Sequence, residues 1–173
     1  MSSILILTVF LKLKPDAVKE TVLPAIARHL EFELNDAHYT HSKSGTKRWE
    51  LTAAKAQRQK GSETIEMIDL AITLFADDGS LTTIVADQGA YTTNTGDIKL
   101  QKNIVITSPT YTITTDNLTY LDQQEKLIIK DRITVLRDGF ALKAAGASME
   151  VPKNIFHFTG GVSATIQRQK EQP

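Results

Sequence analysis

A repeat with a step of 29 residues limits the possible folds of this chain more than any other feature. Asp87 returns as Asp116 and then as Ala145, each 29 residues further on. The strand-like segments between them keep the same step, since Ile104 returns as Ile133. Each unit has the pattern of a strand, a small or acidic turn, a second strand and a loop. A unit this short cannot bury its own apolar face, so several units must stack around a shared interior.

Strand signals and turn signals fill the chain from residue 31 onward. Residues 81–86 and 112–115 are rich in β-branched side chains, and Gly, Asn and Asp clusters recur between such runs. Ile98 and Leu100 alternate with polar neighbours, which places them on one face of a strand. About four stacked units predict one elongated all-β body of two antiparallel sheets. The alternative is a plain β-sandwich whose periodicity is accidental.

Composition removes several classes of function. Hydrophobic residues make up 41% and charged residues 23%, which is typical of a folded globular protein, and 6% aromatics predict a mainly aliphatic core. The 20 basic and 20 acidic residues cancel, which argues against nucleic acid as a partner. With 0 Cys, disulfides and thiolate chemistry are excluded.

The chain divides into four parts. Residues 1–14 hold an apolar run of about ten residues, which at 1.5 Å per residue spans about half of a ~30 Å hydrocarbon core. We interpret it as the outer half of an N-terminal membrane anchor that appears incomplete in this chain, the alternative being an ordinary buried strand. Residues 15–30 are expected to be a linker, residues 31–167 the β-domain, and residues 168–173 a polar tail.

Motifs for catalysis and for metal binding are weak. The sequence has no Gly-rich phosphate loop and no nucleophile elbow, and a strand would place His38 and His41 on opposite faces. We therefore predict no catalytic residue, no metal and no cofactor. Asp87 and Asp116 leave a paired-carboxylate hydrolase as an alternative, because neighbouring repeats could bring them together. Trp49 is predicted to cap one end of the core, with a ligand contact at the mouth as the other interpretation.

The order of the motifs resembles the LptC family of lipopolysaccharide-export proteins, over roughly Phe32 to Ile166. The resemblance rests on the following motifs, in this order: Gly45-x-x-Arg48-x-x-Leu51-x-Ala53-x-x-Ala56, Ile84-x-Ala86-Asp87-x-Gly89-x-Tyr91, Gly96-Asp97-Ile98-x-Leu100-x-x-Asn103-x-x-Ile106, Thr115-Asp116-x-Leu118-x-Tyr120 and Gly160-Gly161-Val162.

The resemblance implies a twisted open β-jellyroll in the periplasm, anchored to the inner membrane by a single N-terminal helix. Members of the family receive lipopolysaccharide from the ABC transporter LptBFG and pass it to an LptA-type bridge protein. Their jellyrolls join edge to edge, so that lipid A acyl chains travel along one apolar groove. The likeness thus predicts a lipid-binding component and no enzyme. The alternatives are a scaffold domain that acts only by edge-strand docking and a soluble LptA-like bridge protein.

The inward positions of the alternating strands are the candidate lipid-binding residues, although ordinary core packing would explain each of them equally well. The expected edges of the sheet are residues 31–40 and 161–167, where strand addition could join partners. The lipid-binding candidates are Leu51, Leu70, Ile72, Leu74, Ile84, Ile98, Leu100, Ile104, Ile106, Ile113, Leu118, Tyr120, Leu127, Ile129, Ile133, Val135, Phe156 and Phe158.

Overall fold

The computed structural model describes residues 30–43, 45–76, 78–150 and 155–166. The expected anchor over 1–14, nearly all of the linker over 15–30 and the polar tail over 168–173 lie outside these residues. Within the described part of the chain, no helix has the length and apolarity needed to cross a membrane.

The described residues form twelve β-strands and one short 3-10 turn, η2 (Asp122–Gln124). The six long strands come first and the six short strands follow. In chain order the strands are β1 (Leu30–Lys43), β2 (Thr46–Gln59), β3 (Thr64–Phe75), β4 (Leu81–Thr92), β5 (Ile98–Thr107), β6 (Thr112–Leu121), β7 (Lys126–Ile129), β8 (Ile133–Arg137), β9 (Phe140–Ala144), β10 (Gly146–Glu150), β11 (Ile155–Thr159) and β12 (Ser163–Ile166).

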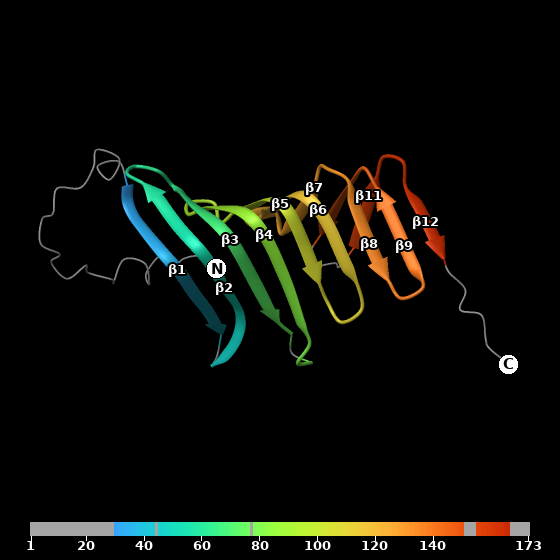
Figure 1. The fold of residues 1–173 in the computed structure, drawn as a ribbon, viewed down its shortest axis with the longest axis horizontal. Helices are drawn as coiled ribbons and strands as arrows, with labels where there is room; N and C mark the ends of the chain where they lie inside the picture. The colour runs from blue at the N-terminus through green and yellow to red at the C-terminus, as the bar shows by residue number, and fades with distance from the viewer. Residues whose placement is uncertain (1–29, 44, 77, 151–154, 167–173) are drawn as a thin grey trace, which may run out of the picture.

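All twelve strands belong to one antiparallel sheet, which branches after β6. Strands β1 to β6 pair with their chain neighbours in order, so the first half is a meander. Residues 119–121 of β6 then pair with β7, and residues 112–114 pair with β8. One branch continues through β10 to β11, and the other through β9 to β12. Figure 1 shows the strands following one another along the long axis, from β1 at one end to β12 at the other.

A crease runs across the long strands and folds the sheet over. Asp69 in β3 and Asn103 in β5 have left-handed backbones, with φ of 50° and 49°. The register between β4 and β5 shifts between Val85 and Gln88, and irregularities of this kind bend a strand. The crease therefore divides the sheet into two arms. We call the arm that ends in β7, β10 and β11 the β11 arm, and the arm that ends in β8, β9 and β12 the β12 arm.

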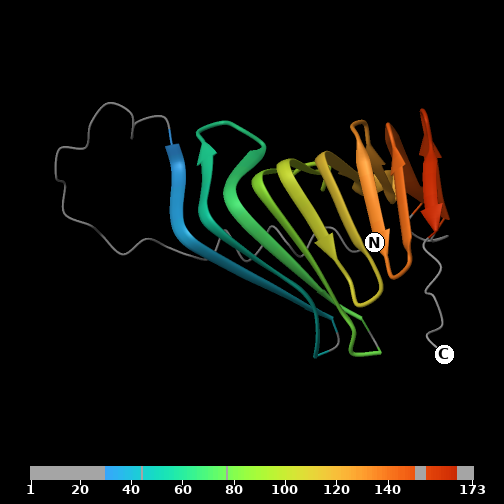
Figure 2. The same ribbon diagram turned by 45° about the vertical axis from the view of Figure 1, so that its right-hand side comes forward.

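The two arms are the two layers that the sequence predicts. The prediction of a twisted open β-jellyroll is confirmed, with the two layers joined by hydrogen bonding into one folded sheet. In Figures 1 and 2 the long strands curve through the crease and the short strands of the β11 arm lie behind those of the β12 arm. Buried side chains from both arms form a single hydrophobic cluster between them.

The repeat follows from how side chains pack at the crease. Ala86, Thr115 and Ala144 are buried there at steps of 29 residues, one from each successive unit. The large side chains Leu100 and Ile133, which are 1% and 0% exposed, come from the strands between them. Small and large residues thus alternate from strand to strand, which lets the two arms approach closely at the crease. The recurring small positions in the sequence are the places where this close approach occurs.

Candidate apolar groove

An apolar ladder lines the inner face of the β12 arm, one inward position away from the crease. Its members are directly opposite one another in successive strand pairs, so they form a continuous row across the arm. The row consists of Leu51, Ile72, Ile84, Ile106, Ile113, Val135, Leu142 and Ala164.

A second ladder lines the β11 arm at the corresponding depth and carries more aromatic side chains. Burial raises the pKa of Tyr91 and of Tyr120, and the negative charge of Asp122 raises both pKa values further. The tyrosine hydroxyls are therefore held neutral in this row. The row consists of Ile65, Tyr91, Ile98, Tyr120, Leu127, Met149 and Phe156.

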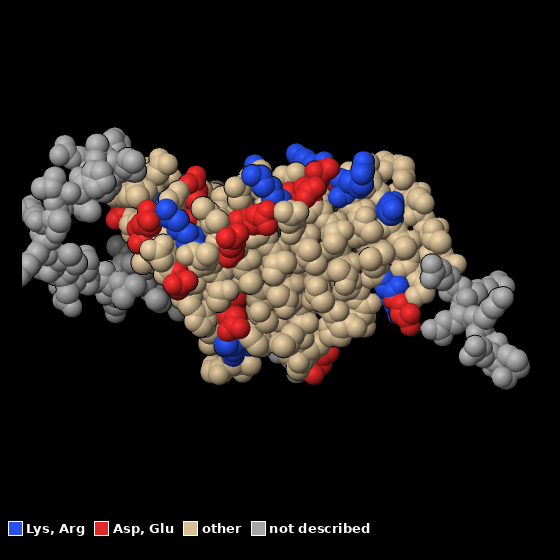
Figure 3. Space-filling view, in the orientation of Figure 1, with Lys and Arg blue, Asp and Glu red and all other residues tan. Residues whose placement is uncertain are grey.

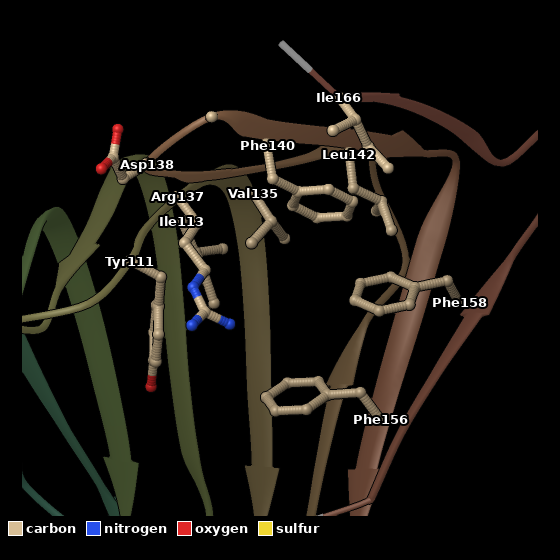
Figure 4. A pocket seen from close by; sticks show the side chains of 11 residues that line it. Tyr111, Ile113, Val135, Arg137, Asp138, Phe140, Leu142, Phe156, Phe158 and Ile166 are labelled. Carbon is tan, nitrogen blue, oxygen red and sulfur yellow. The ribbon is translucent and has the colours of Figure 1, made fainter. Parts of the chain in front are cut away.

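The arms separate toward the C-terminal end, where they enclose an apolar pocket of about 750 Å³. This volume lies in the usual range for ligand pockets, about 300–1,000 Å³. Strands β6, β8, β9 and β12 form one wall, and β11 forms the facing wall (Figure 4). The lining residues are Tyr111, Ile113, Val135, Arg137, Asp138, Gly139, Phe140, Leu142, Phe156, Phe158 and Ile166.

Two stacked phenylalanines form the β11 wall of this pocket. The rings of Phe156 and Phe158 are nearly parallel, at 9°, with their centroids 6.0 Å apart. Phe156 is 36% exposed and Phe158 packs against the core cluster. In Figure 4 both rings point across the pocket toward Val135 and Leu142. An exposed aromatic facing an apolar wall indicates a surface that a ligand can cover.

Another aromatic pair lies at the opposite end of the groove. The rings of Tyr39 and Trp49 are tilted by 44° with centroids 5.1 Å apart, and burial raises the pKa of Tyr39. Trp49 is half-buried and lies opposite Leu74 of β3, one inward position beyond the ladder. This placement suits both earlier interpretations of Trp49, which can cap the core and border the groove.

The structure gathers the predicted site residues on the inner faces of the two arms. Fifteen of the eighteen candidates belong to the hydrophobic cluster, and the other three are Leu74, Tyr120 and Phe156. Candidates at the crease, such as Leu100, Ile104 and Ile133, are completely enclosed by neighbours. Those side chains pack the core, whereas the ladders and the pocket present the accessible inner surface.

Several pocket residues were missed from the sequence. The missed residues with an apolar or aromatic side chain are Tyr111, Phe140, Leu142 and Ile166. Alternation of Phe140, Leu142 and Ala144 was a usable signal, because it places all three on one face of a strand. Arg137, the last residue of β8, has no feature in the sequence that marks it as a site residue.

The two repeated aspartates have a structural role at the crease. The amide Nδ2 of Asn103 donates a hydrogen bond of 2.7 Å to Asp87 Oδ2, and the Asn103 backbone N–H donates one of 3.2 Å to Asp116 Oδ1. The carboxylates therefore hold the bent backbone of β5, which explains them without a hydrolase. Over the described ranges there is also no group of three or more His, Asp or Glu placed to hold a metal ion.

Charge is distributed unevenly over the outside. Figure 3 shows charged side chains gathered along the crease, at the upper margin, and a broad uncharged area below it on the β12 arm. An outward ladder of neutral residues accounts for this area: Thr73, Thr83, Thr107, Thr112 and Leu136. The net charge of zero therefore does not mean that charges are spread evenly over the surface. The side seen in Figure 3 has no basic face that could bind nucleic acid.

Three strands are edges within the described part of the sheet. β1 pairs with β2 alone, β11 with β10 alone, and β12 with β9 alone. The expected edges at residues 31–40 and 161–167 therefore correspond to β1 and β12, and β11 is a further edge that the sequence did not indicate. The C-terminal end presents one free strand from each arm, on either side of the pocket.

Fold and groove together define the class of this protein: an elongated, open β-jellyroll whose inner faces form an apolar groove. The sequence profile described as "Lipopolysaccharide-assembly, LptC-related" matches residues 3–167, and the chain belongs to this family. Members are components of lipopolysaccharide transport and are not enzymes, as the sequence predicted. Family membership implies a periplasmic location.

Comparison with solved structures finds a distant likeness. The crystal structure of LptH, the LptA homologous periplasmic component of the conserved lipopolysaccharide transport device from Pseudomonas aeruginosa, is 11% identical. The likeness covers 79% of this chain and 94% of that chain, with a TM-score of 0.33. A comparison with curated proteins finds no match.

Proposed function

We propose that the groove between the arms binds the lipid A acyl chains of lipopolysaccharide. In this role the protein receives lipopolysaccharide from the inner-membrane ABC transporter LptBFG and passes it to an LptA-type bridge protein. The observation that carries the proposal is the pair of apolar ladders, which extend across both arms and end at an open pocket of about 750 Å³. Transfer along such a groove needs no covalent step, in agreement with membership of a transport family.

The chemistry of the walls supports acyl chains as the ligand. The β12-arm ladder is wholly aliphatic from Leu51 to Ala164. Burial of apolar surface contributes about 25 cal/mol per Å², so an acyl chain lying along several ladder residues gains several kcal/mol. The gain is non-directional, which lets a chain slide from one strand to the next without breaking specific bonds.

The free edges support transfer between proteins. A partner strand added at β12 or β11 would extend an arm and, with it, the apolar wall beside the pocket. Ile166 in β12 is 75% exposed, and residues 155–157 of β11 are exposed, so both edges are accessible. The N-terminal edge β1 is the matching site for a component on the transporter side.

Site-specific photocrosslinking tests the groove. A crosslinking amino acid replaces Val135 or Phe156 on the inner faces, and Thr134 or His157 serves as its outward control on the same strand. During transport in cells, the inward probes are expected to capture lipopolysaccharide and the outward probes are not. Equal capture from both faces, or none from the inward probes, would contradict the proposal.

The same experiment separates the scaffold alternative. A domain that acts only by strand docking has a solid interior, and its inward probes would give crosslinks to protein alone. Full burial of Leu100, Ile104 and Ile133 fits a solid core at the crease under both readings. The two functions therefore differ only at the ladders and the pocket.

Proline replacements in β12 test docking at the edge. In an antiparallel strand, successive N–H groups point to opposite sides. One of the two residues Ala164 and Thr165 therefore directs its N–H toward β9, and the other directs its N–H toward the free edge. Proline on the side of β9 is expected to destabilise the domain. Proline at the other residue should leave stability intact and abolish association with the bridge protein. If both variants associate normally, β12 is not the docking edge.

A further inference from the structure

One basic side chain, Arg137, lies beside Asp138 at the rim of the mainly apolar pocket. Along β8 the inward residues are Ile133 at the crease, then Val135, then Arg137. Their exposure rises in that order, from 0% for Ile133 to half-buried for Val135 and exposed for Arg137. At about 3.3 Å per residue, Arg137 stands roughly 13 Å from the closed bottom of the groove.

The guanidinium of Arg137 lies among rings. In Figure 4 it extends into the pocket next to Tyr111, with Phe156 across from it, while the carboxylate of Asp138 points away. Among the described residues the side chain of Arg137 makes no hydrogen bond and no ion pair, and only its backbone is paired, with Phe140 of β9. Arg58 is the contrasting case, because it donates two hydrogen bonds, of 2.8 and 2.7 Å, to Glu31.

A guanidinium with free donors at the rim of an apolar pocket matches one class of ligand. Its planar fork of N–H groups binds phosphate oxygens two at a time. An amphiphile whose chain extends past Val135 toward Ile133 would place its head group at the height of Arg137. The hydroxyl of Tyr111 points in the same direction as the guanidinium (Figure 4) and can donate a further hydrogen bond.

We propose that Arg137 binds the phosphate head group of an amphiphile whose acyl chain occupies the C-terminal pocket. This inference rests on the proposed function, since it takes the pocket to hold an acyl chain. Arg137 would then select phosphorylated lipid over neutral lipid of equal chain length.

Binding of two matched amphiphiles tests the inference. Dodecyl phosphate and dodecyl maltoside share one chain and differ in the charge of the head group, and both are titrated below their critical micelle concentrations. Arg137→Gln is expected to weaken dodecyl phosphate about tenfold or more and to leave dodecyl maltoside unchanged. Arg137→Lys should recover part of the affinity as a point charge without the fork. Arg132→Gln is the matched control, an exposed arginine in the turn at the crease, and should change neither ligand.

The outcomes distinguish failure of the role of Arg137 from failure of the proposed function, which is acyl-chain binding in the groove. If Arg137→Gln binds dodecyl phosphate as tightly as the parent chain, the role of Arg137 is wrong and the groove still stands. If the parent chain binds neither amphiphile, the proposed function itself fails. Inorganic phosphate is the third probe, and binding as tight as that of dodecyl phosphate would identify a site for free phosphate instead of a lipid head group.

Discussion

Gly89 of β4 packs against the side chain of Leu70 in β3, and a side chain at residue 89 would crowd this leucine. A Cβ at residue 89 would stand 3.0 Å from Leu70 Cδ2 and 3.3 Å from Leu100 Cδ2. These distances are shorter than most contacts of real Cβ atoms, so an added methyl requires a core leucine to shift by a few tenths of an ångström. This close approach is the local form of the small-large alternation that closes the crease.

Gly89→Ala is therefore expected to destabilise the domain by about 1–3 kcal/mol. Leu70→Ala alone should cost about 2–5 kcal/mol through the cavity it leaves. In the Leu70→Ala background the added methyl has space, so Gly89→Ala should become neutral or stabilising. Urea unfolding of the four proteins measures the coupling. Strictly additive free energies would show that the two residues do not compete for this space.

Thr115 offers a substitution that should stabilise the protein. It is 6% exposed, and its hydroxyl has no hydrogen-bond partner among the described residues. Ile104 lies opposite it in the core. Thr115→Val keeps the shape and removes the buried hydroxyl, which should raise the free energy of unfolding by about 1 kcal/mol. Thr115→Ser is the control and should destabilise, because it keeps the hydroxyl and loses the methyl.

Asn103 combines a left-handed backbone with two hydrogen bonds at the crease. Asn103→Gly keeps the conformation easily and loses the amide bond to Asp87, so it should cost about 0.5–1.5 kcal/mol. Asn103→Val adds the strain of a β-branched residue at φ of 49°, so it should cost about 1–3 kcal/mol more. Equal losses in thermal unfolding for both variants would show that the backbone conformation carries no cost.

The raised pKa values of Tyr91 and Tyr120 predict a loss of stability at alkaline pH. An unfolded tyrosine titrates near pH 10, and burial disfavours the phenolate in the folded protein. The stability that comes from this difference is fully present below about pH 10, where the tyrosines are protonated in both states. It declines as the pH rises from the unfolded value through the raised folded pKa, because the unfolded state ionises first.

Tyrosinate absorbance of the parent chain, Tyr91→Phe and Tyr120→Phe would measure these two titrations. Asp122→Asn should lower both pKa values in part and leave them above the ordinary value, because burial is the larger cause. A return of both to the ordinary value in Asp122→Asn would show that charge, rather than burial, is the main cause.

Phe156 is the best position for a test of lipid binding without loss of fold. A charge at Leu100 or Ile129 would also disrupt the core, since these residues are 1% and 3% exposed. Phe156 is 36% exposed, so Phe156→Glu should leave the unfolding midpoint nearly unchanged. It should weaken lipopolysaccharide binding about 10–100-fold, the equivalent of about 1.5–3 kcal/mol of lost aromatic burial. His157→Glu, one residue further on and facing outward, should bind normally, and loss of binding in both variants would contradict the groove assignment.

Much of the fold could be predicted from the sequence because its signals are local and repeated. Alternation in Ile98 and Leu100 placed both on the inner face, and the 29-residue step located Ala86 and Thr115 at one structural level. Both signals depend on the two-residue period of a strand, which holds wherever one face is buried. The family resemblance then agreed with this architecture and is confirmed.

Other features were decided by tertiary structure. The sequence marked Asp87 and Asp116 as equivalent, but only the folded chain brings both to Asn103. No local pattern marks Arg137 as a pocket residue, because only the folded chain places Phe156 of the β11 arm across from it. Its position depends on the pairing of distant strands and on the bend at the crease, neither of which a local pattern specifies.

The sequence by itself therefore determined the kind of protein: an all-β repeat with an apolar inner face and no assembled catalytic motif. Tertiary structure decided which inner residues close the core and which remain open. The physical reason is the crease, where small residues let the arms touch around Ile133 and bury it completely. Further from the crease the arms diverge, and the same alternating pattern that fills the core at Ile133 lines an open pocket at Val135.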